Sequence, residues 1–159
     1  MKKKLSLLLA VSMCLCLCAC GSSTKLSVSD VNEAFADCDG TLETETSGDS
    51  VTSFTYVVEG VNADNLVDRE YTLEAIESIM SGDTSKVTMG QYMVSKAVLP
   101  VMSIEVLLGG EEENFVTDAF LNRILSIVCD GGTVEYDGWS VSSSVDIAND
   151  SITIYAVSK

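Results

Sequence analysis

The fold is decided by two runs of alternating side chains joined by a polar turn: Thr41-Leu42-Glu43-Thr44-Glu45-Thr46, then Ser47-Gly48-Asp49-Ser50, then Val51-Thr52-Ser53-Phe54-Thr55-Tyr56-Val57-Val58-Glu59. Such runs are rich in β-branched and aromatic residues, and a Gly-containing link between them predicts a β-hairpin. In the second run Phe54, Tyr56 and Val58 line one face, while the alternate positions from Ser53 to Val57 line the other.

Helices are predicted on both sides of this hairpin. Ser29 is a suitable N-cap for a helix that continues to about Asp37, and Gly40 can end it. The segment from Gly60 to Arg69 is predicted to be a polar loop. Pro100 is expected to kink or split the longest of three further helices, which are predicted at residues 72–80, 84–108 and 111–128.

The last part of the chain is predicted to be β-structure. One face of a strand is formed by residues that alternate along the sequence: Trp139, Val141, Val145 and Ile147. A turn at Asn149-Asp150 leads into a returning strand at residues 151–157, and residues 133–136 are a candidate for one more short strand.

A short motif before the first hairpin recurs before the second. Cys38-Asp39-Gly40-Thr41-Leu42-Glu43 is matched by Cys129-Asp130-Gly131-Gly132-Thr133-Val134-Glu135, and each copy follows a predicted helix. Coincidence is the alternative, because Gly is a common helix stop and Thr a common strand opener. The predicted fold class is α+β, in which two helix–hairpin units form a four-stranded antiparallel sheet packed against three or four helices.

The N-terminal residues have the pattern of an export signal. Residues 2–4 are all Lys, and they precede an apolar run over residues 5–17 that is too short to span a membrane. The end of this segment, Leu17-Cys18-Ala19-Cys20, resembles the lipobox of bacterial lipoproteins, in which an aliphatic and two small residues precede an invariant Cys. This resemblance implies cleavage after Ala19 and attachment of a diacylglycerol to the thiol of Cys20.

The expected organisation is a signal peptide over residues 1–19, a lipid-anchored tether over residues 20–27 and a single α+β domain over residues 28–159. The resemblance implies that acyl chains such as palmitate on Cys20 hold the protein at the extracytoplasmic face of the cell membrane. The alternatives are an ordinary signal peptide cut after Ala19, which gives a secreted protein, and an uncleaved membrane helix.

The charge balance excludes one class of partner. Without residues 1–19 the chain has 140 residues. These include all 24 acidic residues but only 6 of the 9 basic residues. The resulting net charge near −18 repels nucleic acid, and no basic stripe offsets it. The expected partners are the membrane, through the anchor on Cys20, and an unknown protein or small ligand.

The chain contains no histidine. Its absence excludes Ser-His-Asp and Cys-His nucleophilic catalysis, and it excludes zinc sites that contain His. No cofactor and no metal site are predicted.

Six cysteines are present, of which three leave with the signal. With Cys20 acylated, Cys38 and Cys129 remain, and such a pair in an exported protein is a candidate disulfide. If the two hairpins pair in one sheet, both cysteines lie near the same end of it, which favours the bridge. Two separate buried thiols are the alternative, because Cys packs well as a small hydrophobe.

The stretch Asp37-Cys38-Asp39-Gly40-Thr41-Leu42 resembles the D-x-D-G-T-L signature of haloacid dehalogenase-type phosphatases. That resemblance implies Asp37 as the nucleophile and Asp39 as the general acid/base. The family requires a buried parallel strand before the motif, whereas residues 31–36 have the pattern of an amphipathic helix. No alternating βα pattern supports a doubly wound sheet.

The leading functional prediction is a non-enzymatic binding or interaction module on the outer face of the membrane. One alternative is an exported enzyme that uses carboxylates, with Asp37 and Asp39 as its catalytic residues. Another is an inhibitor-like module, because the helix-then-hairpin layout of residues 29–59 looks like the small PepSY-type domains of exported bacterial proteins. The loop from Gly60 to Arg69 is the exposed segment that such an inhibitor would use.

Overall fold

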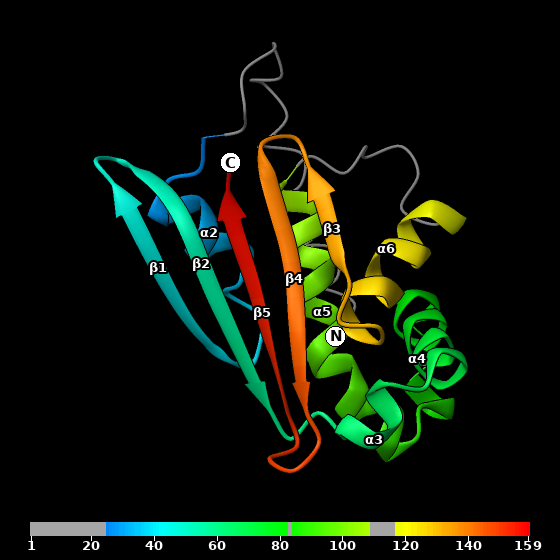
Figure 1. Cartoon of the computed structure of the whole chain (residues 1–159). Helices are drawn as coiled ribbons and strands as arrows, with labels where there is room; N and C mark the ends of the chain where they lie inside the picture. Colours follow the sequence, from blue (N-terminus) through cyan, green and yellow to red (C-terminus); the bar gives the residue numbers. More distant parts are fainter. Residues whose placement is uncertain (1–24, 83, 109–116) are drawn as a thin grey trace.

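The structure, a computed structural model, describes residues 25–82, 84–108 and 117–159. These residues form two layers, an antiparallel sheet and a group of helices on one of its faces (Figure 1). The α+β class is thus confirmed, but the sheet has five strands rather than four. The additional strand is the short candidate at residues 133–136, which pairs along its whole length with the strand that follows it.

The strand order across the sheet is β1-β2-β5-β4-β3, with every neighbouring pair antiparallel. The strands are β1 (Thr41–Ser47), β2 (Ser50–Glu59), β3 (Thr133–Tyr136), β4 (Trp139–Asp146) and β5 (Ser151–Ser158). The two predicted hairpins, β1–β2 and β4–β5, lie side by side as expected, because β2 pairs with β5, and β3 is added at the outer edge of β4. β5 suits its central place in the sheet because Ile152, Ile154 and Ala156 bury one of its faces completely.

The helices are α2 (Val28–Ala34), α3 (Ala63–Leu66), α4 (Arg69–Ser81), α5 (Met89–Leu107) and α6 (Asp118–Val128), with one 3-10 turn, η1 (Thr84–Lys86). In Figure 1, α2 and α5 lie behind the sheet, whereas α3 and α4 lie to its right and pack on α5. α5 passes behind the middle of the sheet, α2 lies behind β1 and β2, and α6 packs against β3 and β4. Pro100 lies within α5 and does not split it, because the helix is held in place by burial on both sides of that residue.

Two helices begin at residues that the sequence did not indicate. Ser27, not Ser29, caps α2: its Oγ accepts a hydrogen bond from the Asp30 N–H (3.2 Å), and its own N–H donates to the Asp30 carboxylate (2.8 Å). Thr88 and Gln91 make the same reciprocal pair at the start of α5, with both distances 3.1 Å. The predicted start of the last helix, at residue 111, lies outside the described residues.

The segment from Gly60 to Arg69 is not the exposed polar loop that was predicted. It contains α3, and Val61, Ala63 and Leu66 are buried. These apolar side chains outweigh the polar ones because α3 packs against both α4 and α5. A protruding inhibitory loop at this place is therefore excluded.

The hydrophobic core lies between the sheet and the helices. Phe54, Tyr56 and Val58 of β2 face it as predicted, and Phe35 stacks on Tyr56 with ring centroids 4.6 Å apart. Ile147, which was expected on the inner face of β4, lies beyond the end of that strand and is exposed. At the N-terminal end, Leu26 is buried and its carbonyl accepts the Val51 N–H at 2.8 Å, so the packed domain begins within the predicted tether.

Candidate functional site

One face of the sheet has no described helix over it, and Figure 1 shows this face toward the viewer. We call it the open face. Because neighbouring strands are in register, its side chains form four rows: Glu45-Ser53-Val157-Ser140-Glu135, Glu43-Thr55-Tyr155-Ser142-Thr133, Thr41-Val57-Thr153-Ser144 and Glu59-Ser151-Asp146. Side chains of alternate residues share a face of a sheet, so the rows follow directly from the pairing.

The middle of the open face is apolar. Tyr155 and Val157 on the central strand are 41% and 51% exposed, and the half-buried Val57 on β2 lies diagonally next to Tyr155, opposite Thr153. Serine and threonine hydroxyls surround these three side chains. An apolar centre within a polar rim is the arrangement found in protein interfaces, where tyrosine is enriched.

Carboxylates stand at the border of the open face. Glu43 and Glu45 lie on β1, Glu135 lies on β3, and Glu59 and Asp146 end the strands at the other end of the sheet. None of the five described strands contains a Lys or an Arg. The rim is therefore strongly negative.

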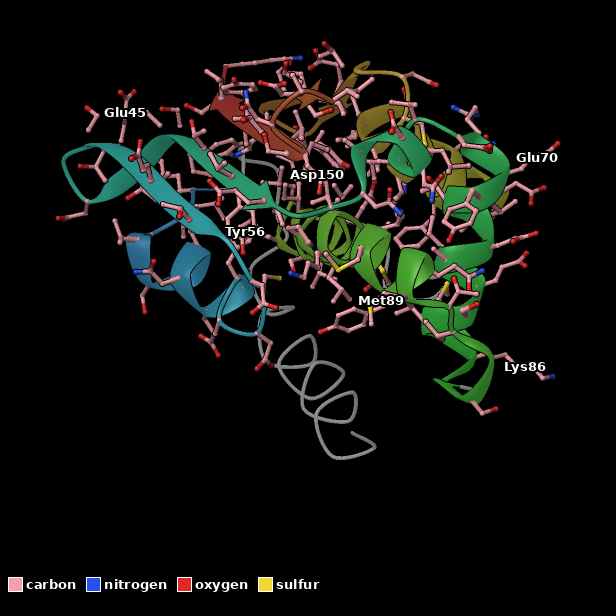
Figure 2. The ribbon with its side chains drawn as sticks, turned by 90° about the horizontal axis from the view of Figure 1, so that it is seen from below. Glu45, Tyr56, Glu70, Lys86, Met89 and Asp150 are labelled. Carbon is pink, nitrogen blue, oxygen red and sulfur yellow. The ribbon has the colours of Figure 1, made fainter. Side chains whose placement is uncertain are left out.

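Two of these carboxylates differ in their partners. Lys159, which directly follows β5, forms an ion pair with Glu135 and lowers the pKa of that carboxyl group. Glu45 accepts a hydrogen bond from Ser53 Oγ (2.8 Å) and has no described cation beside it. Figure 2 shows the Glu45 side chain on the side of the hairpin that faces away from the helices. Within the described residues, no cation therefore compensates the negative charge on β1.

The sheet ends at β1 on one side and at β3 on the other. β1 has seven residues and β3 has four. An edge strand has backbone N–H and C=O groups that point outward without a partner strand. β1 therefore offers the longer row of unpaired backbone groups within the described sheet.

An ionic cluster around the buried carboxylate of Glu105 joins α5, α6 and β3. Arg123 Nε lies 3.0 Å from Glu105 Oε1, Arg123 Nη2 lies 3.1 Å from Oε2, and the Tyr136 hydroxyl donates to Oε1 at 2.6 Å. Burial, and then the hydrogen bond to Glu105, raise the pKa of Tyr136. The Glu105 carboxylate has a donor at each of its two oxygen atoms. We therefore interpret the cluster as a structural clamp that holds α5, α6 and β3 together. Sequence reasoning missed it because the two ion-pair partners are 18 positions apart.

The predicted catalytic carboxylates do not form the arrangement that the phosphatase resemblance implies. Asp37 lies in the turn that follows α2, and both Asp37 and Asp39 are exposed. The described sheet contains no parallel strand pair, and Asp130, which a second acidic motif would use, is paired with Arg69.

The two cysteines are free thiols in the structure, so the predicted disulfide is not formed. Cys38 Sγ lies 3.7 Å from Ser103 Oγ on α5, whereas Cys129 follows α6 and has Thr72 of α4 as its side-chain partner. They precede β1 and β3, which are four strand spacings apart, or about 19 Å. A disulfide needs Cα atoms within about 7 Å of each other.

The matching motifs also serve different purposes. Gly40 allows close approach to Tyr56, since a Cβ there would lie 2.6 Å from Tyr56 Cζ, whereas Gly131 has a positive φ of 60°. The second motif also leads into β3, a strand that has no counterpart in the first unit, so the two helix–hairpin units are not equivalent in the structure.

Neither a metal site nor a membrane span is found in the described part of the chain. No group of three or more Cys, Asp or Glu side chains among residues 25–82, 84–108 and 117–159 is placed to hold a metal ion. None of the helices in these ranges has the length and apolar character that crossing a bilayer requires. The predicted signal peptide and the predicted lipidation site, Cys20, lie outside the described residues.

Comparison with known proteins finds no family that matches the sequence, and no curated protein or solved structure that matches it significantly. The open face is therefore interpreted from its own chemistry.

Proposed function

We propose that the chain is a lipid-anchored, non-enzymatic binding module that works on the outer face of the membrane and binds a protein through the open face. The observation that carries the proposal is the pair of exposed side chains Tyr155 and Val157, with the half-buried Val57 diagonal to Tyr155, on a carboxylate-rimmed sheet. A sheet face is broad, whereas sites for small molecules are concave. A protein partner therefore fits this surface better than a small ligand.

The short tether supports a position close to the membrane. Six residue steps separate Cys20 from Leu26, where the packed domain begins, and a chain of that length spans at most about 20 Å. The Leu26 carbonyl is bonded to Val51 next to the β1–β2 turn, so this end of the sheet faces the bilayer. The strands then lead away from the lipid and leave the open face accessible from the side.

Metabolic labelling with radioactive palmitate tests the anchor. We expect the label in the wild-type protein and in Cys18→Ser, and its loss together with release from the membrane in Cys20→Ser. Cys18→Ser is the matched control because it removes a neighbouring thiol of the same signal. Label that persists in Cys20→Ser contradicts the anchor.

Capture of partners from detergent-solubilised membranes tests the open face. Tyr155→Ala removes its central aromatic ring, and Tyr92→Ala removes a ring that is 53% exposed on α5, in the helical layer. Figure 2 shows Met89, near the start of the same helix, on the side of the molecule opposite the sheet. We expect Tyr155→Ala to lose a partner that Tyr92→Ala retains. Equal capture by two variants with native circular dichroism contradicts the proposal.

A further inference from the structure

We infer that the outer edge of β1 receives an extended segment of the partner, with basic residues two positions apart, which pairs with β1 as an additional strand. The inference rests on the proposed function and specifies the chemistry of its partner. Pairing at a sheet edge is a common way to bind a peptide, because main-chain hydrogen bonds supply affinity and alternate side chains supply specificity.

The first argument is that β1 has few of the usual protections of an edge strand, since only the irregularity between Glu45 and Thr46 resembles one of them. Natural edges are blocked by Lys, by Pro, by bulges or by very short strands. β1 has seven residues, Thr41–Ser47, with no Lys and no Pro, and its pairing is regular up to an irregularity between Glu45 and Thr46. β3 at the opposite edge has only four residues, so β1 is the better template for another strand.

The second argument is the charge of this edge. Glu43 and Glu45 are exposed, lie two positions apart and therefore point to the same face as Tyr155. Residues opposite each other on paired strands have Cβ atoms about 5 Å apart, where opposite charges attract and like charges repel. Basic residues at alternate positions of an incoming strand match these two carboxylates, whereas the β1 edge of a second copy would bring further glutamates to the same place.

The third argument is the contrast between the two edges. Glu135 on β3 has Lys159 as its ion-pair partner, whereas the described residues offer Glu43 and Glu45 no cation. With a net charge near −18 for the chain beyond residue 19, the protein as a whole also attracts a basic segment.

A synthetic nine-residue peptide with Lys at alternate positions and Thr or Val between them is a direct probe. It is titrated against the mature lipoprotein in detergent, with fluorescence anisotropy as the measurement. We expect saturable binding that weakens as salt is added, and no binding of a peptide in which Glu replaces each Lys. Absence of binding by the Lys peptide overturns the inference.

Variants distinguish binding of the peptide at β1 from its attraction to the net negative charge of the protein. The double variant Glu43→Gln/Glu45→Gln keeps side-chain shape and removes both charges, and we expect it to bind the peptide about three- to tenfold more weakly. Glu135→Gln is the matched control at the other edge, and its affinity should stay within about twofold of wild type. An unchanged affinity in the double variant, or an equal loss in the control, overturns the inference.

Two N-methylated peptides test strand pairing itself. One carries methyl groups on the alternate amides that face one side of the extended peptide, and the other carries them on the remaining amides. A paired strand donates to β1 with one of these sets only, so we expect one peptide to lose binding and the other to keep it. Equal binding of both indicates association by charge alone and overturns the inference.

The two proposals fail in different ways. If Tyr155→Ala loses the partner and the Lys peptide does not bind, the open face remains the binding site. The inference about β1 is then wrong. If the peptide binds to β1 and the variants Tyr155→Ala and Tyr92→Ala capture the partner equally well, the open face is not the binding site. Light scattering that shows a dimer of the free protein, lost in a Glu43→Lys variant, assigns the β1 edge to a second copy and overturns the inference.

Discussion

Arg123 on α6 binds Glu105 on α5 through two of its guanidinium nitrogens, although Glu105 is only 1% exposed. Tyr136 on β3 donates to the same carboxylate, so one side chain connects two helices to the edge of the sheet. The Arg123 side chain is 37% exposed, so the two partners of this ion pair differ strongly in their access to solvent.

This inequality predicts which substitution destabilises the protein more. Arg123→Met leaves a buried carboxylate whose remaining partner in the cluster is Tyr136, and removing one member of a buried pair costs about 3–5 kcal/mol. Glu105→Gln leaves a guanidinium that can turn toward water, so we expect a smaller loss, about 1–3 kcal/mol. Urea unfolding measures both, and a larger loss in Glu105→Gln would contradict the clamp.

Alkaline pH is expected to destabilise the fold. Burial raises the pKa of Tyr136, with a further increase from Glu105, and burial also raises the pKa of Tyr56. In the unfolded chain a tyrosine loses its proton near pH 10, while the folded protein retains it, so the unfolded state binds fewer protons above that pH. The stabilisation of the folded state by these protonated tyrosines is complete below about pH 10. It is lost as the pH rises further, by about 1.4 kcal/mol per pH unit for each tyrosine.

Tyr136→Phe tests this pH dependence. We expect the free energy of unfolding of the variant to fall less steeply than that of the wild type above about pH 10, because one of the groups that keeps its proton has been removed. Urea unfolding at several pH values between about 8 and 11 gives the two slopes. Identical slopes would show that Tyr136 is not protonated preferentially in the folded state.

Gly40 is expected to tolerate no side chain. An added Cβ would lie 2.6 Å from Tyr56 Cζ and 2.6 Å from the Val57 carbonyl oxygen, so the backbone at the start of β1 would have to move. Forcing extra volume into a packed site costs about 1–3 kcal/mol, and we expect Gly40→Ala to lose that much stability in urea. A variant within about 0.5 kcal/mol of wild type would show that β1 can shift freely.

Tyr56→Phe should leave stability unchanged or raise it. Within the described residues, the Tyr56 hydroxyl is the one buried side-chain polar atom without a hydrogen-bond partner. A buried polar group without a partner costs about 1–3 kcal/mol, and Phe keeps the stacking on Phe35. Thermal unfolding of Tyr56→Phe measures the change, and a clear loss of stability would indicate that the hydroxyl has a partner in solution.

Much of the fold follows from local patterns. The alternation in β2 predicts which side chains face the core, because the period of a strand fixes its two faces. The register between the hairpins β1–β2 and β4–β5 does not follow, since the pairing of Tyr56 with Ile154 joins residues far apart in the sequence. The residues 60–69 were misread because three apolar side chains in a polar segment have no clear period.

The open face was only partly visible in the sequence. Ser53, Thr55 and Val57 were assigned to one face of β2, but their neighbours on β5 depend on a register that the sequence does not reveal. The repeated Cys-Asp-Gly motif suggested a relationship between Cys38 and Cys129 that the strand order contradicts, because local similarity carries no information about which strands become the edges.

The state of the two thiols gives the last prediction. Burial raises the pKa of both Cys38 and Cys129, so we expect the folded protein to react slowly with an alkylating reagent. After unfolding without a reductant, mass spectrometry of the protein in its proposed form, cleaved after Ala19 and acylated on Cys20, should show two adducts, and Cys38→Ala should show one. A disulfide would instead give no adducts until reductant is added, and reduction would lower the free energy of unfolding by about 2–5 kcal/mol. Since β1 and β3 are opposite edges of one sheet, a bridge between the segments that precede them would require a different strand order.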